Sequence, residues 1–202
     1  NISRILNFYA GEIDFYHLNL RDVAFIYSKQ ISKNWDMKIR EDPGGAPLNT
    51  DFLAFNWNAK KSNLRELFSN QSFRRAVSHA IDRKKLISRV FHGLAYPQEG
   101  PISPFSPYYS SVSTKGYPAE YNPELARRLL HDIGFSDRDN DEWLDNSRGS
   151  NLSFELIIDK GNERREKLAT FIKESLRKIG IKLEIKKLSF ENTLRKIFTG
   201  DF

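Results

Sequence analysis

The stretch LSFELIIDKGNERREKLATFIKESLRKIGIKLEI, residues 152–185, decides the fold. Apolar and polar side chains alternate at the start of 152–158, and the segment then runs apolar, a pattern typical of a half-buried β-strand. Residues 162–179 have helical periodicity, Gly180 ends that helix, and alternation resumes over 181–185. The sequence therefore predicts an α/β fold (mixed α+β) that contains a β-α-β unit with two parallel strands.

Composition limits the classes of protein to consider. The chain has 202 residues, 39% of them hydrophobic and 15 of them Phe, which is enough for a substantial core. It has no cysteine, which excludes disulfides and thiolate chemistry. The net charge is +6, but the basic pairs are scattered over different elements and alternate with 26 acidic residues. We therefore predict no nucleic-acid site.

The two ends of the sequence suggest a piece of a longer protein. The first residue is Asn1 and lies inside a helix-like segment, and the chain stops directly after Gly200-Asp201-Phe202. There is no signal peptide and no apolar run long enough to cross a membrane. The sequence therefore leads us to expect a fragment, so the missing signal says nothing about location.

Residues 73–91 predict one amphipathic helix. Their apolar side chains recur at helical spacing, and the arginines and lysines between them are expected to face water. Gly93 provides the stop signal.

The remaining segments are assigned by pattern. Residues 3–15 predict a helix, a Gly stop and a short strand, and 21–32 predict a second helix. Residues 51–58 predict an apolar strand, and the Pro- and Tyr-rich segment 96–121 predicts an ordered loop whose aromatic rings pack. Residues 122–133 predict a helix that begins with Asn-Pro-Glu, a favourable N-terminal sequence.

No catalytic group emerges from the sequence. Ser78, His79 and Asp82 are the residue types of a hydrolase triad, but neighbouring side chains on a helix diverge. His79 is predicted to be exposed or half-buried, and the histidines show no metal-ligand spacing. We therefore predict that the chain is not an enzyme and needs no cofactor.

The segment Asp137-Arg138-Asp139-Asn140-Asp141 resembles the first half of a calcium-binding EF-hand loop. Such a loop needs Gly at its sixth position and Glu at its twelfth, where this chain has Glu142 and Arg148. The sequence therefore predicts a polar surface loop here and no metal site.

Five motifs in the same order resemble family 5 extracellular solute-binding proteins, the peptide, nickel and related receptors of ABC importers. The motifs are Gly11-Glu12-Ile13-Asp14, the strand that ends at Asn56, the tract from Arg74 to Arg83, Asn122-Pro123-Glu124 with the helix that follows, and Gly200-Asp201-Phe202. The resemblance implies one lobe of a type II periplasmic-binding-protein fold. In it, residues 1–15 join from the first lobe, and 16–202 form the second, carboxy-side lobe, truncated at the return crossing.

The resemblance also implies a function. The parent would be a monomeric receptor that captures a peptide or similar small solute between its two lobes and delivers it to a permease of the inner membrane. It would lie in the periplasm or on the extracellular surface, with a lipid anchor as one form of attachment. The alternative is the ligand-sensing lobe of a transcriptional regulator that carries a family 5 domain.

The candidate ligand-binding residues are few. Ligands of α/β sheets bind at the carboxyl ends of strands and at helix N-termini, which points to Asn162, Glu163 and Arg164. Backbone amides of this loop and the Arg164 side chain are expected to hold a ligand carboxylate. The resemblance adds Phe190 as an aromatic residue of the cleft and Asn56 at the end of its strand.

Two departures from the family pattern leave the ligand open. The anchors that follow Gly-Asp-Phe in the family lie beyond Phe202, and Ile197 and Phe198 stand where several receptors have Arg or His.

Overall fold

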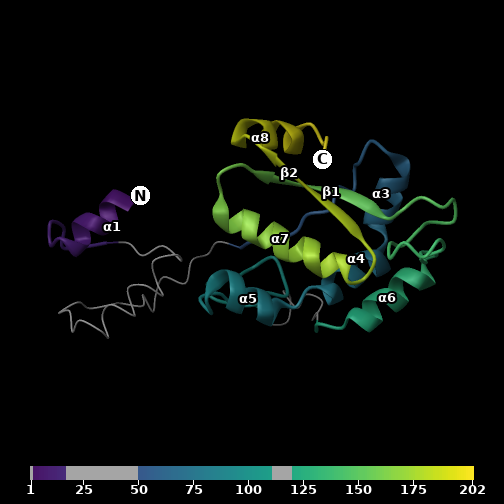
Figure 1. Ribbon diagram of the computed structural model, residues 1–202, viewed down its shortest axis with the longest axis horizontal. Helices are drawn as coiled ribbons and strands as arrows, with labels where there is room; N and C mark the ends of the chain where they lie inside the picture. Colours follow the sequence, from purple (N-terminus) through teal and green to yellow (C-terminus); the bar gives the residue numbers. More distant parts are fainter. Residues whose placement is uncertain (1, 17–49, 111–119) are drawn as a thin grey trace. The chain divides into compact units, whose positions relative to one another are not determined.

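The computed structural model of the chain describes residues 2–16, 50–110 and 120–202 (Figure 1). The chain separates into two compact units, Asn1–Ala46 and Pro47–Phe202. The helix predicted at 21–32 lies outside the described residues. The division into a joining segment, 1–15, and a second lobe, 16–202, stays a prediction.

The described part of the first unit is helix α1, Ile2–Tyr9, and the turn after it. Gly11 has a φ of 75°, which ends the helix in the left-handed region as the sequence predicts. The short strand predicted after it is wrong, because residues 12–16 have no strand assignment. The ring of Tyr16 instead lies 5.9 Å from that of Phe8, so this segment turns back toward the helix.

The β-α-β unit is confirmed. Strand β1, Ser153–Asp159, and strand β2, Lys182–Leu188, pair in parallel, and helix α7, Glu163–Arg177, connects them. The register pairs the first residues of the two strands with each other and the last residues with each other, so the two carboxyl ends lie side by side. Helix α8, Phe190–Phe198, follows β2 and lies on the other side of the strands from α7 in Figure 1.

In the described part of the second unit, four helices precede the β-α-β unit: α3, Ser62–Ser69, α4, Gln71–Ala80, α5, Arg83–Phe91, and α6, Pro123–Asp132. Helix α6 begins as predicted, with the Asn122 side chain accepting a hydrogen bond from the Leu125 amide. The core lies between α4, α6, α7 and the strands, and its largest fully buried side chains are Phe73, Leu130, Ile179 and Ile181.

The predicted single helix over 73–91 is wrong, because the chain leaves the helical conformation between α4 and α5. Ile81 has extended backbone angles (φ −97°, ψ 109°), and the Asp82 side chain accepts a hydrogen bond from the Lys85 amide and so begins α5. The Arg83 guanidinium donates to the Ser78 carbonyl and hydroxyl oxygens at 3.0 and 2.9 Å. Arg83 is therefore half-buried across the break and does not face water as predicted.

The strand predicted at 51–58 is wrong, since none of these residues has a strand assignment and 57–58 form a turn. Within the described residues they have no ladder partner, because the sheet consists of β1 and β2 alone. Leu53 and Phe55 nevertheless pack against the core. The segment is therefore an extended stretch of chain that covers part of the core.

The Pro- and Tyr-rich segment packs less than expected. Tyr96 and Tyr108 are 71% and 83% exposed, which makes the predicted packing wrong for these two rings. Tyr96 does contact Phe105, with ring centroids 4.9 Å apart. Residues 111–119 lie outside the described part of the chain.

A loop, 133–152, connects α6 to β1 along the amino edge of the sheet. The Leu144 amide donates to the carbonyl oxygen of Gly180 at 2.8 Å, which fastens the loop to the turn between α7 and β2. Gly180 has a φ of 78°, and a Cβ there would lie 2.7 Å from Leu144 Cγ. A glycine is required at this close approach.

Candidate functional site

The carboxyl edge of the sheet is where β1 ends and α7 begins. The Lys160 amide donates to the Leu188 carbonyl at 2.7 Å, which joins the loop after β1 to the end of β2. Asn162 begins α7, and its side-chain oxygen accepts a hydrogen bond from the Arg165 amide at 3.2 Å. The remaining amides of the first helical turn have no partner within the helix, which makes this edge favourable for negative charge.

The charged residues at the start of α7 are paired. Arg164 Nη1 lies 3.2 Å from Asp51 Oδ2, which ties the start of α7 to the segment 51–56. Glu163 Oε1 lies 3.1 Å from Lys167 Nζ, one helical turn further along. Arg165 pairs with Asp159 at the end of β1. A ligand carboxylate at Arg164 would therefore compete with Asp51.

Phe190 is the first residue of α8 and is 63% exposed. It follows the end of β2, whose Leu188 carbonyl is bonded to the loop that leads to α7. The structure therefore brings Phe190 to the same edge as the three predicted residues of the α7 start, Asn162, Glu163 and Arg164.

Asn56 lies elsewhere. Its side chain is buried, and Nδ2 donates to the carbonyl oxygens of Gly200 and Phe202 at 2.9 and 2.6 Å. Its Oδ1 accepts from the Asn58 amide at 3.0 Å. These acceptors follow the carboxyl end of α8, about 13 Å of helix away from Phe190. Asn56 therefore fixes the Gly-Asp-Phe segment and is separate from the α7 start.

Sequence reasoning did not connect three exposed aromatic residues with the Asn56 hydrogen bonds. Trp57, Phe198 and Phe202 are 59%, 84% and 42% exposed. The Arg74 guanidinium lies 4.8 Å from the Trp57 ring centroid and covers part of that ring. The signal in the sequence was the placement of large aromatic residues beside the two tracts that Asn56 joins.

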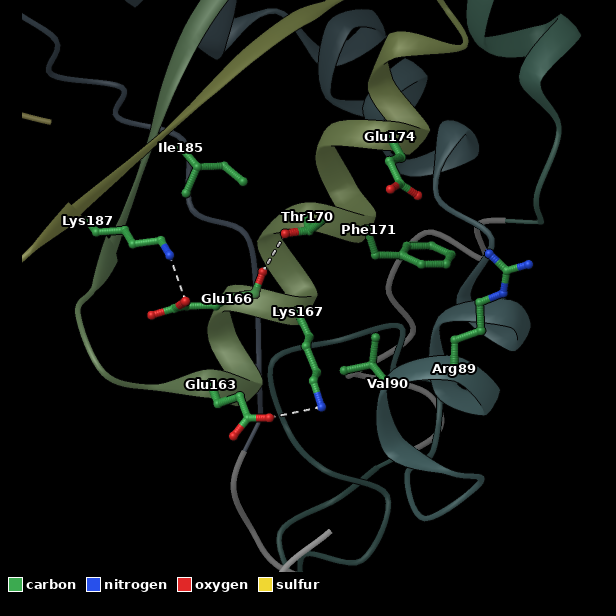
Figure 2. A pocket seen from close by; sticks show the side chains of 10 residues that line it. All are labelled: Arg89, Val90, Glu163, Glu166, Lys167, Thr170, Phe171, Glu174, Ile185 and Lys187. Atoms are coloured by element: carbon green, nitrogen blue, oxygen red, sulfur yellow. Dashed lines mark hydrogen bonds and ion pairs between the residues drawn. The ribbon is translucent and has the colours of Figure 1, made fainter. Parts of the chain in front are cut away.

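A shallow groove of about 580 Å³ runs beside the carboxyl edge between α5, α7 and β2 (Figure 2). Val90 and Phe171 supply apolar lining. The groove's two lysines are engaged, since Lys187 donates to Glu166 at 2.6 Å and Lys167 pairs with Glu163. Neither lysine is therefore available to a ligand without the loss of an ion pair.

The Glu166–Lys187 pair predicts a pH effect. The hydrogen bond from Lys187 lowers the pKa of the Glu166 carboxyl from its usual value of 4.5. A carboxyl with a lowered folded pKa stabilises the fold above its unfolded pKa, and this contribution is lost as the pH falls through the folded pKa. Glu166→Gln should therefore make Tm fall less steeply between about pH 5 and pH 3.

The measurement is a series of thermal melts across that range. Asp132→Asn, at the end of α6, corrects for the loss of one surface carboxylate. Equal slopes for Glu166→Gln and the natural protein would contradict the proposed contribution of the pair.

The three residues that resemble a hydrolase triad are engaged separately. Ser78 Oγ accepts from Arg83, Asp82 caps α5, and His79 Nδ1 donates to the Glu120 carbonyl at 2.7 Å. His79 is 4% exposed, so the prediction of an exposed or half-buried histidine is wrong, because this long-range hydrogen bond draws the ring inward. The arrangement agrees with the expectation that they do not act on one another.

Two solved proteins that this chain resembles are oligopeptide-binding proteins. The oligopeptide-binding protein AppA of Bacillus subtilis, solved with a nonapeptide, matches with a TM-score of 0.60 at 32% identity over 65% of this chain and 26% of that chain. An oligopeptide-binding protein OppA matches with a TM-score of 0.66 at 31% identity over 73% of this chain and 23% of that chain. The fold class predicted from the sequence, a type II receptor lobe, is confirmed.

The assignment to a family rests on a match over the whole sequence. The model of the bacterial extracellular solute-binding proteins, family 5 (middle region), matches residues 1–202, and the chain belongs to this family. A probable ABC transporter-binding protein of Deinococcus radiodurans is 28% identical over 93% of this chain and 31% of its own length. AppA is 32% identical over 87% of this chain and 29% of its own length. The chain thus spans about a third of the length of these curated relatives.

The family consists of bacterial extracellular solute-binding proteins, and it is the family that the sequence motifs resemble. Among the helices that the structure describes, none has the length and apolar character needed to span a membrane.

Proposed function

We propose that this chain forms one side of the solute site in a receptor that serves an ABC importer. The receptor holds a peptide or a similar small solute between two lobes and passes it to a membrane permease. Its relative AppA is an oligopeptide-binding protein, and the chain aligns with AppA over 87% of its length. It acts by binding and closure, without catalysis, in the periplasm or at the cell surface, with a lipid anchor as one form of attachment.

The observation that carries the proposal is the grouping at the carboxyl edge. Arg164 supplies a guanidinium beside the α7 N-terminus, and Asn162 and Glu163 lie directly before it in the chain. Phe190 supplies an exposed ring at the same edge. A positive group, free helix amides and an aromatic face together suit a ligand with a carboxylate and an apolar part, as a peptide has.

Asn56 has a positioning role in this proposal. By holding the Gly200 and Phe202 carbonyl groups, it sets the direction in which the backbone leaves α8. The exposed Phe198 and Phe202 then lie on the surface available to the other lobe or to the ligand. The regulator alternative has no support from the relatives described above, all of which are binding proteins of transport systems or of peptides.

The first test changes the Arg164–Asp51 pair in the natural full-length receptor. Arg164→Ala should weaken binding of a peptide with a free carboxylate by about 10- to 100-fold, because a hydrogen bond to a charged group contributes about 1.5–3 kcal/mol. Asp51→Asn removes the competing carboxylate, so the affinity should stay the same or rise. Calorimetry measures both, and Arg128→Ala on the exposed side of α6 serves as the matched control.

The same peptide with an amidated carboxyl end provides the decisive comparison. Arg164→Ala should not change the affinity for the amide. Arg164→Ala could instead lower the affinity equally for the peptide with a free carboxylate and for the amidated peptide, or Asp51→Asn could lower it as much as Arg164→Ala does. Either result would show that the pair is structural and would remove Arg164 from the site.

The peptide assignment has its own test. Native mass spectrometry of the full-length receptor should reveal a co-purifying peptide or other small solute. A protein free of any solute, together with no thermal shift across a peptide library, would contradict it.

A further inference from the structure

Three carboxylates meet in the loop between α6 and β1, at the opposite edge of the sheet from the proposed solute site. Asp137, Asp139 and Asp145 each place a carboxylate oxygen within 4.8 Å of the other two. Among the described residues, none of the three forms an ion pair with a basic side chain. Within the described residues, their mutual repulsion is therefore not offset by an ion pair.

Asp145 provides an independent sign of a ligand. The residue is only 2% exposed, and its Oδ1 is buried and accepts no hydrogen bond in the described part of the chain. Its Oδ2 accepts a single hydrogen bond, from the Arg138 amide at 3.3 Å. A buried carboxylate oxygen without a donor is strongly unfavourable, and buried charges are normally paired or bound to metal.

The other two carboxylates are exposed and held in place by the loop backbone. Asp137 accepts hydrogen bonds from the Asn140 and Glu142 amides at 2.8 and 3.1 Å, and Asp139 accepts from the Asp141 amide at 3.3 Å. Glu142 has a φ of 73°, so it adopts the left-handed conformation for which calcium loops use Gly at this position. The backbone therefore adopts the turn of a calcium loop, although the sequence has Glu142 in place of the usual Gly.

We propose that Asp137, Asp139 and Asp145 bind a calcium ion. Carboxylate oxygens alone suit a hard cation and not zinc or copper. Calcium accepts irregular sets of six to eight oxygen ligands, whereas magnesium demands near-ideal octahedral geometry and is rarely held by protein ligands alone. Arg148 stands where a bidentate Glu completes an EF-hand, so the affinity is in the weak range of extracellular sites, about 10⁻⁴ to 10⁻³ M.

Bound calcium would stabilise the amino edge of the sheet. Asp145 pairs with Ser136 through two backbone hydrogen bonds of 2.9 and 3.2 Å, and its neighbour Leu144 is bonded to Gly180. An ion on the Asp145 carboxylate therefore holds the loop against the turn between α7 and β2. Its effect is on the stability of the lobe, since the site lies away from the carboxyl edge.

Terbium, which replaces calcium, tests the site directly. Trp143 lies two residues before Asp145, so light absorbed by its indole should sensitise terbium luminescence in the loop. Excess calcium should quench the signal by displacement, and the same concentration of magnesium should do so only weakly. Trp143→Phe should lose the luminescence and retain the calcium effect on Tm.

Thermal melts provide the second measurement. At a calcium concentration of about 100 Kd, Tm should rise by roughly 5–10 °C relative to the protein in EGTA. Asp145→Asn and Asp139→Asn should both lose this rise. Asp139→Asn keeps an acceptor for the Asp141 amide at an exposed position, so it tests the site even where Asp145→Asn fails to fold.

Asp132→Asn, which removes a carboxylate of α6 outside the cluster, should keep the full calcium-dependent rise. Absence of terbium luminescence, or a rise that persists unchanged in Asp139→Asn, would overturn the proposal. Equal stabilisation by calcium in all the variants would indicate non-specific binding to the surface.

Discussion

Replacing Phe73 with alanine should lower the free energy of unfolding by about 3–5 kcal/mol, the usual range for removing a buried aromatic ring. Phe73 is 1% exposed and is the point where α4 meets the strands. Its ring centroid lies 5.8 Å from that of Phe55, 6.0 Å from Phe68 and 5.5 Å from Phe154. Removing it would therefore leave three rings without their common neighbour.

Equilibrium urea unfolding measures this effect as a shift of the midpoint. Phe190→Ala is the matched control, because that ring is 63% exposed and its removal should change stability by less than about 0.5 kcal/mol. Phe73→Leu should recover most of the loss, since it fills much of the same volume. A loss below about 1 kcal/mol in Phe73→Ala would mean that the cluster does not hold the core together.

Gly180→Ala should destabilise the protein by about 2–4 kcal/mol, although it adds only one methyl group. The left-handed conformation at this position disfavours any residue with a Cβ. The new Cβ would also lie 2.7 Å from Leu144 Cγ and 3.3 Å from the Leu144 amide nitrogen. One of these contacts is with the backbone, so a rotamer change of Leu144 cannot relieve both.

Gly149→Ala separates the cost of the left-handed conformation from the cost of the steric contact with Leu144. Gly149 has a φ of 72°, close to that of Gly180, but a Cβ there would meet nothing within 4 Å. It should lose only the conformational part, about 1–2 kcal/mol. Equal losses in the two variants, measured by urea unfolding, would show that the approach of Leu144 to Gly180 is not a tight contact.

The sequence alone was sufficient to predict a helix or strand wherever the residues that determine it lie close together in the chain. The alternation over 152–158 and 181–185 and the helical stripe between them led to β1, α7 and β2. The Asn122 cap and the apolar face of α6 were likewise visible in a short window. In each case the residues that decide the structure lie within one or two helical turns of one another.

The helix break at Ile81 and Asp82 was hidden by two competing signals. The apolar spacing continues through 73–91, so periodicity alone favours one long helix. Asp82 is also a strong cap, and its hydrogen bond to the Lys85 amide begins α5. The Arg83 hydrogen bonds to Ser78 then hold the two helices together, a tertiary contribution that the pattern does not contain.

The candidate site was predictable only in part. The start of α7 followed from the rule that ligands bind at the carboxyl ends of strands, and Phe190 came from the family resemblance. The pairing of Arg164 with Asp51 joins positions more than a hundred residues apart, and no local pattern reveals it. The burial of Asp145 likewise depends on how its loop meets Ser136 and Gly180, so the sequence showed a polar loop and no metal site.

The hydrogen bonds of Asn56 place an uneven evolutionary constraint on the chain. Its amide donates to two main-chain carbonyl groups, which every amino acid possesses, so position 202 can change its side chain and keep its part of the contact. Position 200 favours glycine for another reason, since its φ is 65°. Position 56 has no such freedom. Aspartate has the right shape but no donor, and glutamine has the donor but one methylene too many. A change at position 56 therefore loses the contact, whereas a change of side chain at position 202 keeps it.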